Sequence, residues 1–155
     1  MTFFNLSGKA WFVVYTGVDG TLAENTKMIA NWKSSGLVGV AYDTYDPFFT
    51  ANLGGHGRIL SASIESAAGG QTTTGFKVQA QAHPDGAWSD YLVDTDFDSV
   101  YNSNMRFCSD TGPHELAAEG VALIRIDCRG LHAIRFQAKV ASGTATLSAD
   151  ATAGA

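Results

Sequence analysis

The chain has 155 residues, a formal net charge of −5, charged residues at only 16%, 17 glycines and 3 prolines. Its basic residues are scattered rather than clustered, which argues against binding to a nucleic-acid backbone. No stretch reaches the ~18 apolar residues needed to span a bilayer, and the N-terminal run MTFFNLSGKAWFVVY lacks the charged region that precedes the apolar part of a secretion signal.

The length predicts one domain, and many turn residues with few charges favour a β-sandwich or barrel over a helical bundle. We expect an all-β, antiparallel, jelly-roll-like sandwich with at most one short helix. The single domain is expected over residues 1–150, followed by a flexible tail at 151–155 composed of small residues.

The first third of the chain predicts short strands and one ambiguous segment. Residues 10–16 (AWFVVYT) are apolar on both parities, which indicates a strand covered on both faces or one lying in a subunit contact. Residues 21–34 contain a capping-box pattern but also alternate, so they fit a helix and a strand about equally. Residues 37–42 predict a short strand after the Ser34-Ser35-Gly36 break.

Residues 43–57 predict a long loop. Pro47 removes a ladder donor, and three glycines close the segment. The loop carries Tyr45, Phe48 and Phe49, which are expected either to cover the core or to face a partner. Its Gly-rich end is expected to be a turn, because a phosphate-binding loop needs a helix after the glycines.

From residue 58 onward, alternation with a period of two predicts one strand after another. Residues 58–65 form the first. Residues 76–93 (FKVQAQAHPDGAWSDYLV) predict a hairpin around a Pro-Asp-Gly turn, and residues 106–108 predict a short strand. Residues 121–149 predict three strands with turns at Gly130 and Gly143, which we interpret as an antiparallel meander. In each of these strands, alternate residues are expected to face the core. They are Leu60, Ala62 and Ile64; Ala122, Ile124, Ile126 and Cys128; His132, Ile134, Phe136, Ala138 and Val140; and Ala145, Leu147 and Ala149.

No pattern in the sequence indicates a catalytic, cofactor or metal site. Asp94, Asp96 and Asp98 resemble the start of a calcium loop, but the later glycine and glutamate are missing, so a solvated acidic loop is favoured and cation binding is left open. The four histidines lack zinc spacings, and no Gly-x-Ser-x-Gly motif is present. We therefore expect no enzyme, cofactor or metal.

Two features leave alternatives open. Cys108 and Cys128 are expected to be small buried thiols, although the sequence does not tell whether they are joined. The three tryptophans at positions 11, 32 and 88 would suit a sugar-binding platform, but residues of the core or of an interface are favoured.

The C-terminal half resembles a known kind of virion protein. Residues 88–92 (WSDYL) end the predicted hairpin and are followed by Gly112-Pro113, Gly120 and IRIDCRGLHAIRFQAKVASGTATLSADA. This order of strand, Gly turn, strand with alternating basic residues, Ser-Gly turn and Thr-rich strand resembles small jelly-roll-like structural proteins of tailed-phage particles, above all head cement or decoration proteins. The resemblance covers residues 76–150.

The resemblance implies a non-enzymatic protein on the outside of the capsid, assembled in the host cytoplasm, that clamps neighbouring major capsid protein subunits. It also implies a homo-oligomer, a dimer or trimer, without nucleic acid or membrane as a partner. The alternative is a carbohydrate-binding sandwich module of a tail or host-recognition structure. The residues expected at an oligomer or capsid contact are Phe3, Phe4, Trp11, Phe12, Tyr45, Phe48 and Phe49.

Overall fold

The computed structural model describes residues 2–6, 10–14, 29–40, 44–55, 59–92 and 104–154; for 2–6, 10–14, 29–31 and 154 the description covers the backbone. The elements are β1 (Thr2–Leu6), β2 (Ala10–Val14), β3 (Ile29–Val38), β4 (Asp46–Asn52), β5 (Ile59–Ser66), β6 (Thr73–Gln81), β7 (Ser89–Leu92), β8 (Met105–Phe107), a single 3-10 turn η2 (Pro113–Glu115), β9 (Val121–Asp127), β10 (Ala133–Val140) and β11 (Ala145–Gly154).

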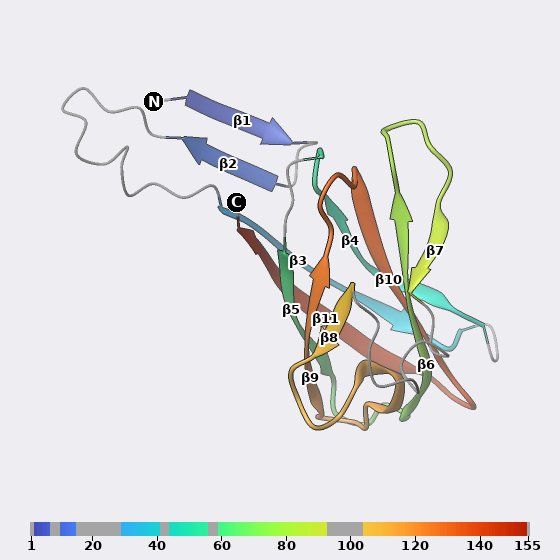
Figure 1. The fold of residues 1–155 in the computed structure, drawn as a ribbon. Coiled ribbons are helices and arrows are strands. Elements are labelled where there is room, and N and C mark those ends of the chain that lie inside the picture. The colour runs from blue at the N-terminus through green and yellow to red at the C-terminus, as the bar shows by residue number, and fades with distance from the viewer. Residues whose placement is uncertain are drawn as a thin grey trace.

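Two antiparallel sheets pack face to face (Figure 1). The five-stranded sheet has the order β3-β11-β5-β9-β8, and the four-stranded sheet has the order β4-β10-β6-β7. A separate two-stranded sheet joins β1 and β2. In the described part of the chain, η2 is the single helical turn, so the all-β sandwich with at most one short helix is confirmed. That turn is far too short to cross a membrane.

The strands are wound as a jelly roll. Apart from β1, β2 and β8, the described strands make four nested pairs: β3 with β11, β4 with β10, β5 with β9, and β6 with β7. Successive pairs alternate between the two sheets, and the innermost pair is the hairpin around Pro84 and Asp85. Such nesting is what results when one long antiparallel hairpin is rolled into two layers.

The predicted meander at residues 121–149 is wrong in its pairing, although all three strands exist. β10 pairs with β4 and β6 in the four-stranded sheet, whereas β9 and β11 lie on either side of β5 in the other sheet. The turns at Gly130 and Gly143, both at positive φ, therefore carry the chain between sheets. A period of two defines the buried face of a strand, but it does not identify the neighbouring strand.

The N-terminal half of the sandwich also differs from the prediction. Residues 43–57 are not one long loop, because β4 occupies their centre with Pro47 on an edge strand. β3 begins at Ile29, which resolves residues 29–34 of the ambiguous segment as strand, and it runs through the expected break at Ser34-Ser35-Gly36. Gly36 is needed there, because a Cβ at this position would lie 2.9 Å from the Cα of Phe48.

The predicted flexible tail is also wrong for residues 151–154. They form the end of β11, where Ala151 and Ala153 are buried and the backbone pairs with both β3 and β5. Alternating small residues can look like a mobile tail in sequence, yet here they fill the inner face of a central strand, where larger side chains would not fit.

The core between the sheets is formed by the predicted alternating positions, with His132 as the exception: it lies half-buried just before β10. At the centre, the ring of Phe136 contacts those of Phe48, Phe49 and Phe76 at centroid distances of 6.2, 4.6 and 5.5 Å. In most strands the other parity points outward, and these residues form the two outer faces of the sandwich.

Candidate contact surfaces

The structure separates the predicted contact residues into three groups. Phe48 and Phe49, at 3% and 2% exposure, lie in the core, so their assignment to a contact is corrected. Tyr45 is half-buried just before β4, at the surface. Phe3 and Phe4 belong to β1, and Trp11 and Phe12 belong to β2; their side chains lie outside the description, so these four assignments stay predictions.

The outer face of the four-stranded sheet carries an ordered network, here called the aromatic–cationic face: Tyr45, Lys77, Gln79, Trp88, Asp90, Arg135 and Lys139. The ammonium groups of Lys77 and Lys139 lie 4.8 and 5.1 Å from the centroid of the Tyr45 ring. The guanidinium of Arg135 lies 4.5 Å from the centroid of the Trp88 ring. Each is a cation–π contact that fixes a long basic side chain over an aromatic ring.

Hydrogen bonds join these two stacks across β6. Arg135 Nε donates to Gln79 Oε1 at 2.7 Å, and Gln79 Nε2 donates to Asp90 Oδ1, also at 2.7 Å. Lys77 Nζ lies 3.1 Å from the same carboxylate oxygen. The Gln79 amide and then the Lys77 ammonium hold the pKa of Asp90 below its ordinary value. The face is therefore pre-organised and carries three cations against one carboxylate.

The sequence indicated the members of this face but not their proximity. The basic and amide residues on β6 and β10 fall on the polar parity of both strands. What the pattern could not indicate is that β6 and β10 are neighbours, with Arg135 directly opposite Gln79 and Gln137 opposite Lys77.

An open groove of about 530 Å³ lies between the edges of β3 and β4. Trp32, at 4% exposure, lines it together with Phe48 and Phe49, and its indole Nε1 has no hydrogen-bond partner among the described residues. Ser34 Oγ donates to the Phe48 carbonyl at 3.2 Å and holds the two edges together at one end. The burial of Trp32 removes it from any open sugar platform, and Trp88 is capped by Arg135.

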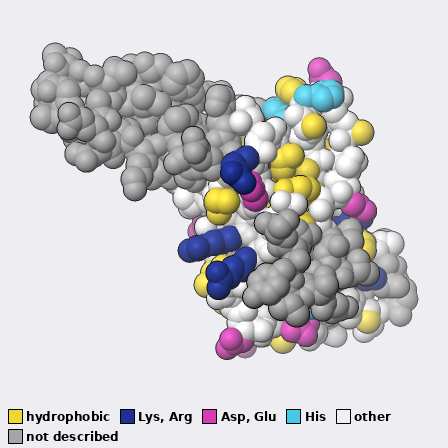
Figure 2. Space-filling view, in the orientation of Figure 1, with side chains coloured by type: hydrophobic (Ala, Val, Ile, Leu, Met, Phe, Trp, Pro, Cys, Tyr) yellow, Lys and Arg dark blue, Asp and Glu magenta, His cyan; other side chains and the backbone are white. Residues whose placement is uncertain are grey.

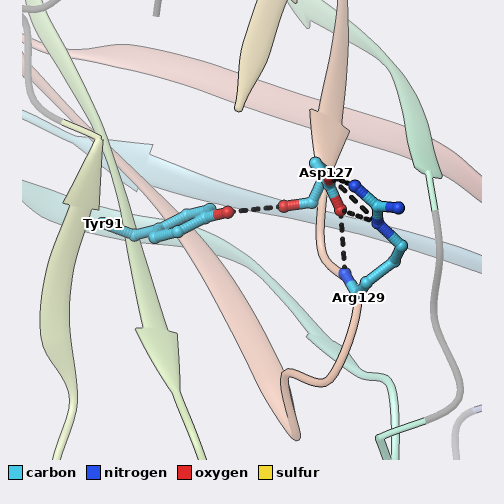
Figure 3. Close-up of polar contacts among 3 residues, drawn as sticks. All are labelled: Tyr91, Asp127 and Arg129. Atoms are coloured by element: carbon cyan, nitrogen blue, oxygen red, sulfur yellow. Dashed lines mark hydrogen bonds and ion pairs between the residues drawn. The ribbon is translucent and has the colours of Figure 1, made fainter. Parts of the chain in front are cut away.

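A second polar cluster closes one end of the sandwich (Figure 3). The Tyr91 hydroxyl, from β7 in the four-stranded sheet, donates to the Asp127 carbonyl at the end of β9 at 2.6 Å. Arg129 Nε lies 3.0 and 3.1 Å from the two carboxylate oxygens of Asp127, and its hydrogen bonds lower the pKa of that carboxyl. This cluster ties the two sheets together, and none of its members is placed as a nucleophile.

The sites considered for chemistry do not assemble in the described residues. The described stretches contain no cluster of three or more His, Cys, Asp or Glu side chains that could hold a metal ion. Asp94, Asp96 and Asp98 lie outside the described residues, as does His56. Neither Cys108 nor Cys128 forms a disulfide: Cys108 is exposed, contrary to the prediction, while Cys128 is buried, and its burial raises the thiol pKa to about 11.

Comparisons with known proteins do not assign a family. No family model matches the chain, and no curated protein matches it. Among solved structures, the chain is similar to the crystal structure of SPBc2 prophage-derived protein YomS, with 15% identity and a TM-score of 0.43, over 81% of this chain and 95% of that chain. A similarity at this level gives no argument about function, which must come from the surfaces described above.

Proposed function

We propose that this protein is a non-enzymatic capsid cement, or decoration, protein of a tailed phage, which binds the outside of the major capsid shell as a homo-oligomer and stabilises it. The observation that carries the proposal is the β1–β2 hairpin. Among the described strands, β1 and β2 pair with each other and with no strand of the sandwich.

The hairpin has a composition that needs another surface. Its sequences, TFFNL and AWFVV, are mostly apolar, and the register sets Phe4 opposite Phe12 and Phe3 opposite Val13. A two-stranded sheet alone is at best marginally stable in water. β2 lies near β3, an edge strand of the five-stranded sheet, without pairing with it, and the sandwich has a core of its own. We infer that a second copy or a shell subunit completes the hairpin.

A cement protein gains strength from several weak contacts held by one rigid body. The aromatic–cationic face supplies a second surface whose side chains are already ordered, so little rotamer entropy is lost when a partner binds. Two surfaces that bind together raise the effective concentration of each for its partner, without a reactive group. This is the way in which an inert sandwich would hold neighbouring shell subunits together.

The test uses particles of the phage that lack this protein. The full chain is expected to co-sediment with them at a copy number comparable with that of the shell subunit, counted by mass spectrometry. A variant lacking residues 1–14 is expected to keep its β-sheet circular dichroism but to lose oligomer mass and most particle binding. The proposal is contradicted if the full chain does not co-sediment with the particles, or if only a few copies per particle do so.

A carbohydrate-binding module is the second candidate, and one observation favours it. Tyr45 and Trp88 lie on the same outer face, close to the amide and carboxylate of Gln79 and Asp90, and a sugar would have to displace the cations that stack on both rings. A glycan array separates the two functions: retention on a specific glycan that is lost in Trp88→Ala but kept in the variant lacking residues 1–14 supports the module and not the cement protein.

A further inference from the structure

Two arginines lie directly opposite each other on the outer face of the five-stranded sheet. Arg106 on β8 is the register partner of Arg125 on β9, and both are exposed. Residues directly opposite in an antiparallel pair point to the same side, and like charges in that position are destabilising. Within the described strands, this register therefore sets two like charges side by side, in a chain of net charge −5.

Neither arginine has a carboxylate partner in the described part of the chain. The ion pairs there join Lys77 to Asp90 and Arg129 to Asp127. Asp127 is two residues from Arg125 on the same face of β9, but its carboxylate is engaged by the fork of Arg129 (Figure 3). The carboxylate nearest along the strand is thus already used, and the cationic pair is left open to solvent.

The surface next to Arg125 is hollowed. A shallow pocket of about 210 Å³ beside Arg125 is lined by Ser61, Ser63, Cys108 and Leu123. Ser61 is directly opposite Arg125, and Leu123 is 45% exposed. Figure 2 shows three basic side chains close together left of centre, with hydrophobic side chains and an acidic side chain beside them.

We propose that the Arg106–Arg125 pair is a docking point for a carboxylate of another protein, with the acidic side chain held by the two guanidiniums and an adjacent apolar side chain against Leu123. Arginine suits this role because its fork binds both oxygens of a carboxylate at once. A bound carboxylate offsets the repulsion between the two arginines. Without a partner, that repulsion lowers the stability of the fold.

A nucleic acid fits this face less well. Phosphate backbones are bound by tracks of basic residues. The rest of this face presents the short side chains of Ser61, Ser63 and Thr152 and the carboxylates of Glu65 and Asp150, and its basic residue Lys33 lies directly opposite Asp150. Those carboxylates would repel a chain of phosphates. One carboxylate flanked by an apolar group needs only the two arginines and the pocket beside them.

The site is tested with the full chain and a hexaglutamate peptide, followed through the NMR signals of the arginine Nε–H groups. Saturable shifts are expected for Arg106 and Arg125. The chemical shifts of Arg129 and Arg135 are expected not to change, because Arg129 is already held by Asp127 and Arg135 by Trp88. Arg106→Gln is expected to weaken binding by about tenfold. Hexaglutamine is the uncharged control, and a six-base single-stranded DNA is the competing ligand.

A second measurement is made without any ligand. Arg106→Gln is expected to raise the melting temperature by about 1–3 °C, because it removes the like-charge pair, while Arg106→Lys leaves it unchanged. A fall in the melting temperature of Arg106→Gln, equal shifts of all arginine signals, or DNA binding as tight as that of hexaglutamate overturns the proposal. The inference rests on the proposed function only for the identity of the partner. The peptide titration tests the docking point, and the particle assay tests the proposed function. Either hypothesis can therefore be refuted without the other.

Discussion

Replacing Phe49 with alanine is expected to lower the free energy of unfolding by about 3–5 kcal/mol. The ring is 2% exposed and lies between the two sheets, where it stacks on Phe136 at a centroid distance of 4.6 Å. Its strand, β4, is an edge strand of the four-stranded sheet. Alanine removes the whole ring and leaves a cavity that Phe136 and its neighbours, already in contact with one another, can fill only in part. The expected loss includes both the lost burial and that cavity.

Equilibrium urea unfolding at 25 °C, followed by circular dichroism, measures this loss as a lower midpoint at an unchanged slope. Tyr45→Ala is the matched aromatic control, since that ring is half-buried on the outer face, and it is expected to cost less than about 1 kcal/mol. If Phe49→Ala is too unstable to purify, Phe49→Leu is expected to cost up to about 1.5 kcal/mol. Equal, small losses in Phe49→Ala and Tyr45→Ala would mean that Phe49 is a surface residue and that the core is misassigned.

Three further outcomes follow from the polar contacts. Tyr91→Phe removes the donor to the backbone carbonyl of Asp127 and is expected to cost about 0.5–1.5 kcal/mol in the same urea assay; no loss would mean that the hydroxyl prefers water. Because burial raises the pKa of Cys128 to about 11, a thiol reagent at pH 8 is expected to label Cys108 alone until the protein is unfolded, and rapid labelling of both thiols would contradict the burial. The pKa of Asp90 is lowered in the folded state, so its small contribution to stability is present above its unfolded pKa and is lost as the pH falls through the folded value. The urea midpoints of wild type and Asp90→Asn are therefore expected to converge below about pH 4, and a constant gap would rule this out.

Strand positions could be predicted where one face of the strand is buried and the other is exposed to solvent. β5, β6 and β9 were expected close to their actual bounds because their apolar residues alternate with polar ones. β4 was missed because Phe48 and Phe49 are both buried and Pro47 precedes them, so the period is broken at a strand edge. β3 was missed in part because its centre, Ser34-Ser35-Gly36, is made of residues typical of turns.

The β6–β7 hairpin was predicted and is confirmed, because its strands are joined by a short turn. The pairing of the last three strands could not be predicted, because it depends on contacts between segments far apart in the sequence. Each of the last three strands has partners more than 50 residues away, such as Ser61 opposite Arg125 and Trp32 opposite Ala151. The aromatic–cationic face arises from such register, whereas the Arg106–Arg125 pair joins the consecutive strands β8 and β9. The sequence shows that these residues are polar and outward, but which of them meet is decided by how the two layers wind.

The outermost of the nested pairs has a practical consequence for anything attached to the chain. Gly154 is the register partner of Ile29, so the sandwich starts and finishes on adjoining strands, at the corner from which the β1–β2 hairpin departs (Figure 1). Cargo fused after residue 155 would emerge beside that hairpin and compete with it for space. A tag grafted instead into the Gly143 turn between β10 and β11, at the far end of β11 from Gly154, would leave this corner clear.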